Sequence, residues 1–187
     1  MVHKSEIDAN CIFNFDTAKT IASSLITSKL DYCNAILSGI SNYNITRLQR
    51  ILKVTAKVVF NTKVGNGDAL CKQLHWLPVK QRIDYKLSLL IHKTLTYNSP
   101  SYLRSLINIS VPTRKLRSSE NGLILDVPFT TTQFSSRAFS VYGPRLWNSL
   151  PKTLRDLAIP DSEQAASVFL FKTHLKTFLF STAYPES

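Results

Sequence analysis

Apolar residues recur at helical spacing in two segments of this chain, residues 44–60 and 80–95, and this periodicity constrains its fold more than any other feature. At 100° per residue, the first segment places its apolar residues on two stripes. One stripe consists of Leu48, Leu52, Ala56 and Val59, and the other of Ile51, Val54 and Val58. Because apolar stripes on a helix pack against neighbouring elements, we expect this helix to be buried on two sides.

Basic residues occupy the remaining side of both predicted helices. In residues 44–60, Arg50, Lys53 and Lys57 stack within about 60° of one another. In residues 80–95, a basic face lies apart from an apolar face formed by Ile83, Leu87, Leu90 and Thr94. The candidate site residues of the two helices are Arg47, Arg50, Lys53, Lys57, Arg82, Lys86 and Lys93. Both helices therefore have an apolar side for the core and a basic side for solvent or a partner.

The positive charge is concentrated in one part of the chain. Lys and Arg total 23 against 12 Asp and Glu, which gives a formal net charge of +11. Residues 42–93 hold ten Lys or Arg and two acids, whereas residues 1–41 hold three Lys and four acids. Because ordinary surfaces mix charges of both signs, this one-sided field indicates a polyanionic partner. We predict contact with a nucleic-acid backbone; the alternatives are an anionic membrane surface and a solvated face without a partner.

The N-terminal segment, residues 16–39, also predicts a helix. We expect Asp16 to cap it, because a short acceptor side chain satisfies the free N–H groups of the first turn. We expect Gly39 to end it, because glycine readily adopts the left-handed conformation that follows many helices. The apolar face of this helix is expected to contain Ile21, Leu25, Tyr32 and Ile36.

The composition changes at about residue 98. Three prolines, a Ser/Arg-rich stretch and a short β-like run at 123–127 indicate a connection with at most a short strand or hairpin. Beyond it we expect a short helix that is broken at Gly143 and Pro144 and closed by Pro151, and then a last helix that begins after Pro160. The predicted fold is mainly α. Its predicted domains are a helical bundle at 1–97, a loop-rich connection at 98–132 and a helical C-terminal extension at 133–187.

No set of catalytic residues is recognisable in the sequence. Nucleotidyl transfer needs carboxylates around two divalent metals, but no two acidic residues are adjacent. None of the glycines lies in the strand–loop–helix setting that binds phosphate. Cys71 and His75 lie four residues apart, but no second Cys/His pair is near them, and structural zinc needs four ligands. We therefore expect a chain without catalytic residues, metal or cofactor.

Each of the two tryptophans could stack on a nucleic-acid base or pack in the core. His75 and Trp76 could stack on a base, as aromatic residues do in proteins that bind single strands. Leucines flank Trp76 just before a proline that suits the start of a helix, so we favour a core role for Trp76. We judge Trp147 in the same way.

The cysteines and the N-terminus indicate in which cellular compartment the protein is expected. The three cysteines form an odd count without a disulfide framework, so reduced thiols are expected. The N-terminus has no apolar signal-peptide core, and no run reaches the about 18 apolar residues that cross a bilayer. We expect an intracellular protein of the cytoplasm or nucleus, without a membrane role.

Seven strings together resemble one protein family. In chain order they are LDYCNAILSGI (30–40), RLQRI (47–51), LHWLPVKQRIDYKL (74–87), PSYL (100–103), LRSS (116–119), RAFSVYGPRLWNSLP (137–151) and FKTHLKTFLF (171–180). Their order and content are similar to the region after the polymerase palm in jockey-like non-LTR (LINE-type) retrotransposon reverse transcriptases of animals.

The resemblance implies a helical thumb followed by a C-terminal extension. A thumb of this family holds the template–primer duplex by its backbone, and the palm aspartates of the family have no matching positions here. The resemblance thus implies a non-catalytic piece of an RNA-directed DNA polymerase. Its expected partners are a DNA or RNA–DNA duplex and the missing palm domain. The alternative is a remnant that acts only as a helical protein-interaction or structural module, without a nucleic-acid role.

Overall fold

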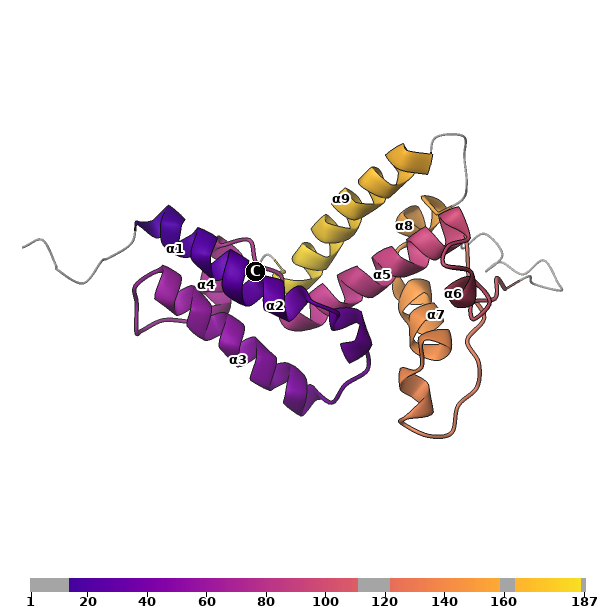
Figure 1. The fold of residues 1–187 in the computed structure, drawn as a ribbon, viewed down its shortest axis with the longest axis horizontal. Coiled ribbons are helices and arrows are strands. Elements are labelled where there is room, and N and C mark those ends of the chain that lie inside the picture. The colour runs from indigo at the N-terminus through magenta and orange to yellow at the C-terminus, as the bar shows by residue number, and fades with distance from the viewer. Residues whose placement is uncertain (1–13, 111–121, 159–163, 186–187) are drawn as a thin grey trace, which may run out of the picture. The chain divides into compact units, whose positions relative to one another are not determined.

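The computed structural model describes residues 14–110, 122–158 and 164–185, and helices dominate these ranges (Figure 1). The β pairing seen in them is an isolated antiparallel bridge between Ile109 and Leu125, in the segment predicted to be rich in loops. No strand occurs in the described ranges. The prediction of a mainly α fold with at most a short strand or hairpin is therefore confirmed.

Contacts divide the chain into two compact units. The first contains residues 14–32 and 43–79, and the second contains residues 33–42 and the described residues from 80 onward. This division falls inside the bundle predicted for residues 1–97. The predicted domain boundaries at 97 and 132 stay predictions.

The first unit is built from helices of unequal length. Its elements are α1 (Phe15–Ala22), a π turn η1 (Ser23–Thr27), α2 (Ser28–Asp31), α3 (Asn42–Val59) and α4 (Gly67–Gln73). The rings of Phe15 and Phe60 lie 5.3 Å apart and connect the start of α1 to the residue that follows α3. None of the helices in the described part of the chain is long and apolar enough to cross a membrane.

The helix predicted at 16–39 differs from the structure in three respects. Asn14 precedes the first turn, and Asp16 lies inside that turn, so Asp16 is not the N-cap. The helix ends at Asp31, because Tyr32 is extended and Cys33 is left-handed with φ of 50°. A separate 3-10 turn, η2 (Asn34–Leu37), follows in the second unit, and Gly39 after it has a positive φ of 69°.

The expected apolar face of this first helix is also wrong. Its four members, Ile21, Leu25, Tyr32 and Ile36, are exposed. The buried positions of the segment are instead small or polar, namely Ala22, Thr27, Asn34 and Ser38. The π turn adds a residue to the helical repeat, so spacing counted at 100° per residue does not hold across it.

Helix α3 buries one of its two predicted apolar stripes. Leu52, Ala56 and Val59 are buried, as predicted, and Leu48, the fourth member of this stripe, is half-buried. The second stripe, formed by Ile51, Val54 and Val58, is exposed by 48%, 55% and 69%. The prediction of a helix buried on two sides is therefore wrong. Periodicity identifies residues that share a face, but a neighbouring element must be present to cover that face.

The second unit has its core around aromatic residues. Its helices are α5 (Val79–Tyr97), α6 (Ser101–Arg104), the 3-10 turn η4 (Ser135–Arg137), α7 (Phe139–Ser149), α8 (Lys152–Asp156) and α9 (Gln164–Ala183). Phe171 of α9 stacks on His92 of α5 at 4.1 Å and on Trp147 of α7 at 5.9 Å. All three side chains are fully buried, so they join three helices in one core.

Helix α7 is not broken at Gly143 and Pro144. It runs through both residues, which are buried, and Gly143 lies against Ile91. Proline in a helix removes one hydrogen bond, and the packing of this buried turn offsets the loss. The helix ends at Ser149 and Leu150 is extended before Pro151, as predicted.

Helix α9 begins at Gln164, after Pro160 as predicted, although Pro160 itself lies outside the described residues. Its buried side is a stripe at spacing i, i+3, i+7 and i+11, formed by Val168, Phe171, Leu175 and Leu179. This stripe holds the helix against the aromatic core.

Candidate nucleic-acid interface

The seven predicted site residues lie on two helices. Arg47, Arg50, Lys53 and Lys57 lie on α3 in the first unit, and Arg82, Lys86 and Lys93 lie on α5 in the second. At 100° per residue, the set on α3 spans about 120° around its helix axis and the set on α5 about 40°. Whether one nucleic acid contacts both sets stays a prediction.

On α3, three of the cations face away from the core. Arg47, Arg50 and Lys57 lie within about 80° of one another around the helix axis. Arg47 and Arg50 are exposed and Lys57 is half-buried. Neither Arg50 nor Lys57 forms an ion pair with a residue that the structure describes. Their charges therefore remain available to a partner.

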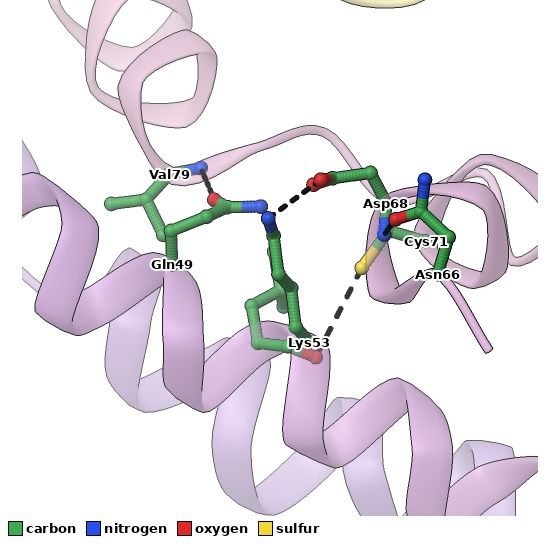
Figure 2. Close-up of polar contacts among 7 residues, drawn as sticks. Gln49, Lys53, Asn66, Asp68, Cys71 and Val79 are labelled. Atoms are coloured by element: carbon green, nitrogen blue, oxygen red, sulfur yellow. Dashed lines mark hydrogen bonds and ion pairs between the residues drawn. The ribbon is translucent and has the colours of Figure 1, made fainter. Parts of the chain in front are cut away.

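Lys53 has a different environment, which Figure 2 shows. Its ammonium nitrogen lies 2.6 Å from Oδ2 of Asp68, which is in the first turn of α4. Its aliphatic stem covers Gly67 so closely that a Cβ there would lie 2.7 Å from the Cβ of Lys53. Lys53 thus connects α3 to α4, and the fold itself neutralises its charge.

Three further hydrogen bonds lie near the ion pair of Lys53 and Asp68 (Figure 2). The Asn66 side chain accepts a hydrogen bond of 2.9 Å from the backbone N–H of Asp68 and caps α4. The Gln49 side-chain oxygen accepts a bond of 2.9 Å from the backbone N–H of Val79. Cys71 is buried, with its sulfur 4.0 Å from the carbonyl oxygen of Leu52. These contacts give α3 a fixed inner side and leave the opposite side to solvent.

On α5, the basic face is narrower than on α3. Arg82, Lys86 and Lys93 lie within about 40° of one another. Lys86 and Lys93 are exposed, and neither is ion-paired with a described residue, whereas Arg82 is half-buried. The predicted apolar face is packed in the second unit, with Ile83, Leu87 and Thr94 buried and Leu90 half-buried.

The two acids of residues 42–93 make their contacts inside the fold. Asp68 pairs with Lys53. Asp84 is largely buried, and this burial raises the pKa of its carboxyl, although nearby Lys80 and the hydroxyl of Tyr142 act in the opposite direction. That hydroxyl donates to Asp84 Oδ1 over 3.4 Å. Neither carboxylate therefore neutralises the outer basic faces.

Burial also bears on the roles of the tryptophans, His75 and Cys71. Trp76 and Trp147 are buried, which confirms both as core residues. His75 is exposed and left-handed, with φ of 56°, whereas Cys71 is buried. Among the described residues, no group of three or more His, Cys, Asp or Glu could hold a metal ion.

One aromatic residue that the sequence did not single out lies on the basic side of α3. Tyr43 is 71% exposed, and the guanidinium carbon of Arg47 lies 5.7 Å from the centre of its ring. The spacing of four residues between a tyrosine and an arginine on one helix was the available signal.

No protein-family model, curated protein or solved structure matches this chain. The resemblance to retrotransposon reverse transcriptases therefore rests on the sequence strings alone.

Proposed function

We propose that this chain is a non-catalytic piece of a non-LTR retrotransposon RNA-directed DNA polymerase, and that it contacts the template–primer backbone without reading bases. Its partners are then a DNA or RNA–DNA duplex and a palm domain that carries the catalytic aspartates. The basic sides of α3 and α5 provide the contact.

The observation that supports this proposal is a set of unneutralised cations on two helix faces. Arg50 and Lys57 on α3, and Lys86 and Lys93 on α5, have no acidic partner among the described residues. Cations held in this way attract phosphates and release the counterions condensed on them. Because phosphates look alike in every sequence, such contacts position a protein without giving base specificity.

Salt dependence tests the proposal. Four phosphate contacts predict that affinity for a duplex falls about 100-fold between about 50 and about 200 mM salt. Fluorescence anisotropy with a labelled DNA duplex and with an RNA–DNA hybrid of the same sequence measures this slope. An affinity that does not change with salt concentration, or no binding at low salt, would contradict the proposal.

Paired substitutions test which face carries the contact. The double variants Arg50→Ala/Lys57→Ala and Lys86→Ala/Lys93→Ala should each lower the salt slope by about 2. If both faces contact the same duplex, the fourfold variant should lower the salt slope by the sum of the two changes. Matched controls remove the same charge elsewhere: Lys63→Ala/Lys72→Ala in the first unit and Lys172→Ala/Lys176→Ala in the second, all at exposed positions. Equal losses in the controls would mean that net charge, not these faces, controls binding.

A second candidate function is a helical protein-interaction module, and the exposed stripe of Ile51, Val54 and Val58 favours it. Contiguous apolar surface on a folded protein often marks a site for another protein. A triple substitution of the stripe by Gln separates the two functions, because it removes apolar surface without changing charge. If the chain binds a purified palm domain of a jockey-like element, and the triple variant loses this binding but keeps duplex affinity, the stripe serves proteins and the cations serve nucleic acid.

A further inference from the structure

Tyr43 and Arg47 form an ordered aromatic surface at the start of α3. Arg47 follows Tyr43 by one helical turn, and its guanidinium carbon lies 5.7 Å from the ring centre. A cation at this distance is attracted to the ring and restrains its orientation. With 71% of Tyr43 exposed, the ring remains open to a partner.

The surroundings of this ring are cationic. Arg47 and Arg50 lie within about 40° of Tyr43 around the helix axis, so all three side chains leave α3 in similar directions. Both arginines are exposed, and α3 contains no acidic residue. An aromatic ring beside cations is the combination by which proteins bind single-stranded nucleic acid, with bases on the ring and phosphates on the cations.

A paired duplex cannot use the ring in this way. Inside a duplex, each base is covered on both faces by its neighbours and offers only its edges in the grooves. A base can stack on a side chain only where it is unpaired. The buried Trp76 offers no such surface, whereas Tyr43, in the same stretch of residues 42–93, is exposed beside Arg47.

We propose that Tyr43, restrained by Arg47 and with Arg50 further along the same side of the helix, stacks on an unpaired base, so that the outer face of α3 prefers a single-stranded segment of nucleic acid to a duplex. This inference rests on the proposed function, because it assumes that the chain contacts nucleic acid, and it names the form of nucleic acid that α3 takes. A template strand beyond the end of its primer has this form.

Abasic strands separate stacking from phosphate contact. The probes are a labelled 20-nucleotide oligothymidine, a strand of equal length with abasic spacers, and a 20-base-pair duplex. The first two carry the same phosphates, so a difference between them measures the bases alone. Wild-type protein should bind oligothymidine about tenfold more tightly than the abasic strand.

Substitutions then assign the difference to one ring. Tyr43→Leu should abolish the preference for oligothymidine, and Tyr43→Phe should retain it, because phenylalanine keeps the ring. The changed position is exposed, and circular dichroism checks that both variants fold. Tyr102→Leu is the matched control, because Tyr102 is 68% exposed in the second unit, and it should leave the preference intact.

The outcomes separate this inference from the function on which it rests. Equal affinity of wild-type protein for both strands, or a preference that survives in Tyr43→Leu, overturns the stacking role while salt-dependent binding still supports backbone contact. Failure to bind any of the three probes at low salt overturns the proposed function, and the stacking role with it.

Discussion

The ammonium nitrogen of Lys53 lies 2.6 Å from a carboxylate oxygen of Asp68, and this ion pair separates one lysine of α3 from the cations beside it. Lys53 shares its side of the helix with Arg50 and Lys57 by sequence spacing. Its ammonium group is nevertheless paired with a carboxylate of α4. Three cations at helical spacing therefore have two roles, one in joining helices and one at the surface.

This difference predicts unequal effects on binding. Arg50→Ala and Lys57→Ala should each reduce the slope of affinity against salt by about 0.9 for a duplex. Lys53→Ala should change the slope little, because a carboxylate already neutralises the ammonium group. Lys53→Ala should instead lower the free energy of unfolding, by about 0.5 kcal/mol, since the pair is more than a third exposed and water screens it. A titration across salt concentrations, together with urea unfolding of each variant, measures both effects; an equal slope change in all three variants would contradict the assignment.

At Gly67, replacement of glycine by alanine should change stability in the direction opposite to the usual one for a helix. Replacing glycine by alanine inside a helix usually raises stability by about 1 kcal/mol. Here the new Cβ would lie 2.7 Å from the Cβ of Lys53, on the backbone side of that side chain, where no rotamer change can relieve the overlap. We expect Gly67→Ala to lower the free energy of unfolding by about 1–3 kcal/mol. Urea unfolding gives the value, and a stability equal to or above wild type would show that α3 and α4 do not approach so closely.

His75 ends α4 in a conformation that suits glycine. Its φ is 56°, and the backbone N–H of Trp76 donates to the Cys71 carbonyl over 2.9 Å, the bond that closes a helix with a left-handed residue. Because a side chain in this region is strained, His75→Gly should raise the free energy of unfolding by about 1 kcal/mol.

The matched control for this prediction is the same substitution inside a helix. His174 is exposed within α9, so His174→Gly should lower stability by about 1 kcal/mol. Thermal unfolding of both variants tests the contrast. A loss of stability in both would mean that the left-handed position carries no strain.

His92 predicts a dependence of stability on pH. Burial lowers the pKa of its imidazole, while its hydrogen bond to the Leu157 carbonyl, 3.1 Å long, raises that pKa to a smaller extent. Its Nδ1 has no hydrogen-bond partner in the described structure, so a proton there would be buried without an acceptor. The folded state therefore binds a proton less readily than the unfolded chain, in which the pKa is near 6.5.

Because the pKa of His92 is lower in the folded state than in the unfolded chain, protonation favours unfolding. The stabilisation is complete above about pH 6.5 and is lost as the pH falls toward the lower pKa of the folded state, at up to about 1.4 kcal/mol per pH unit. Urea midpoints at several values between pH 7.5 and pH 5 should fall accordingly in wild-type protein. A His92→Met variant, which keeps a side chain of similar size, should show a smaller fall over this range, and His174→Gln should leave the fall unchanged. Equal curves for His92→Met and wild type would contradict the prediction.

The positions of α3 and α5 and the inner face of each were predictable from local sequence. The segments predicted at 44–60 and 80–95 agree with α3 and α5 to within two residues at each end. Trp76 and Trp147 are buried as expected from the apolar residues around them. These features depend on the spacing of residues along one helix and on the cost of leaving large apolar groups in water, and both can be counted in a sequence.

By itself, the sequence determined that this chain is mainly helical, which residues share a side of α3 and of α5, and that its cations gather there. Tertiary structure alone decided that Ile51, Val54 and Val58 stay exposed and that Lys53 turns to a carboxylate 15 residues away. It also decided that Tyr43, not Trp76, is the aromatic residue open to solvent on the basic side. The physical reason is that a helical repeat is set by neighbours within two turns, whereas burial and pairing depend on segments that only folding brings close.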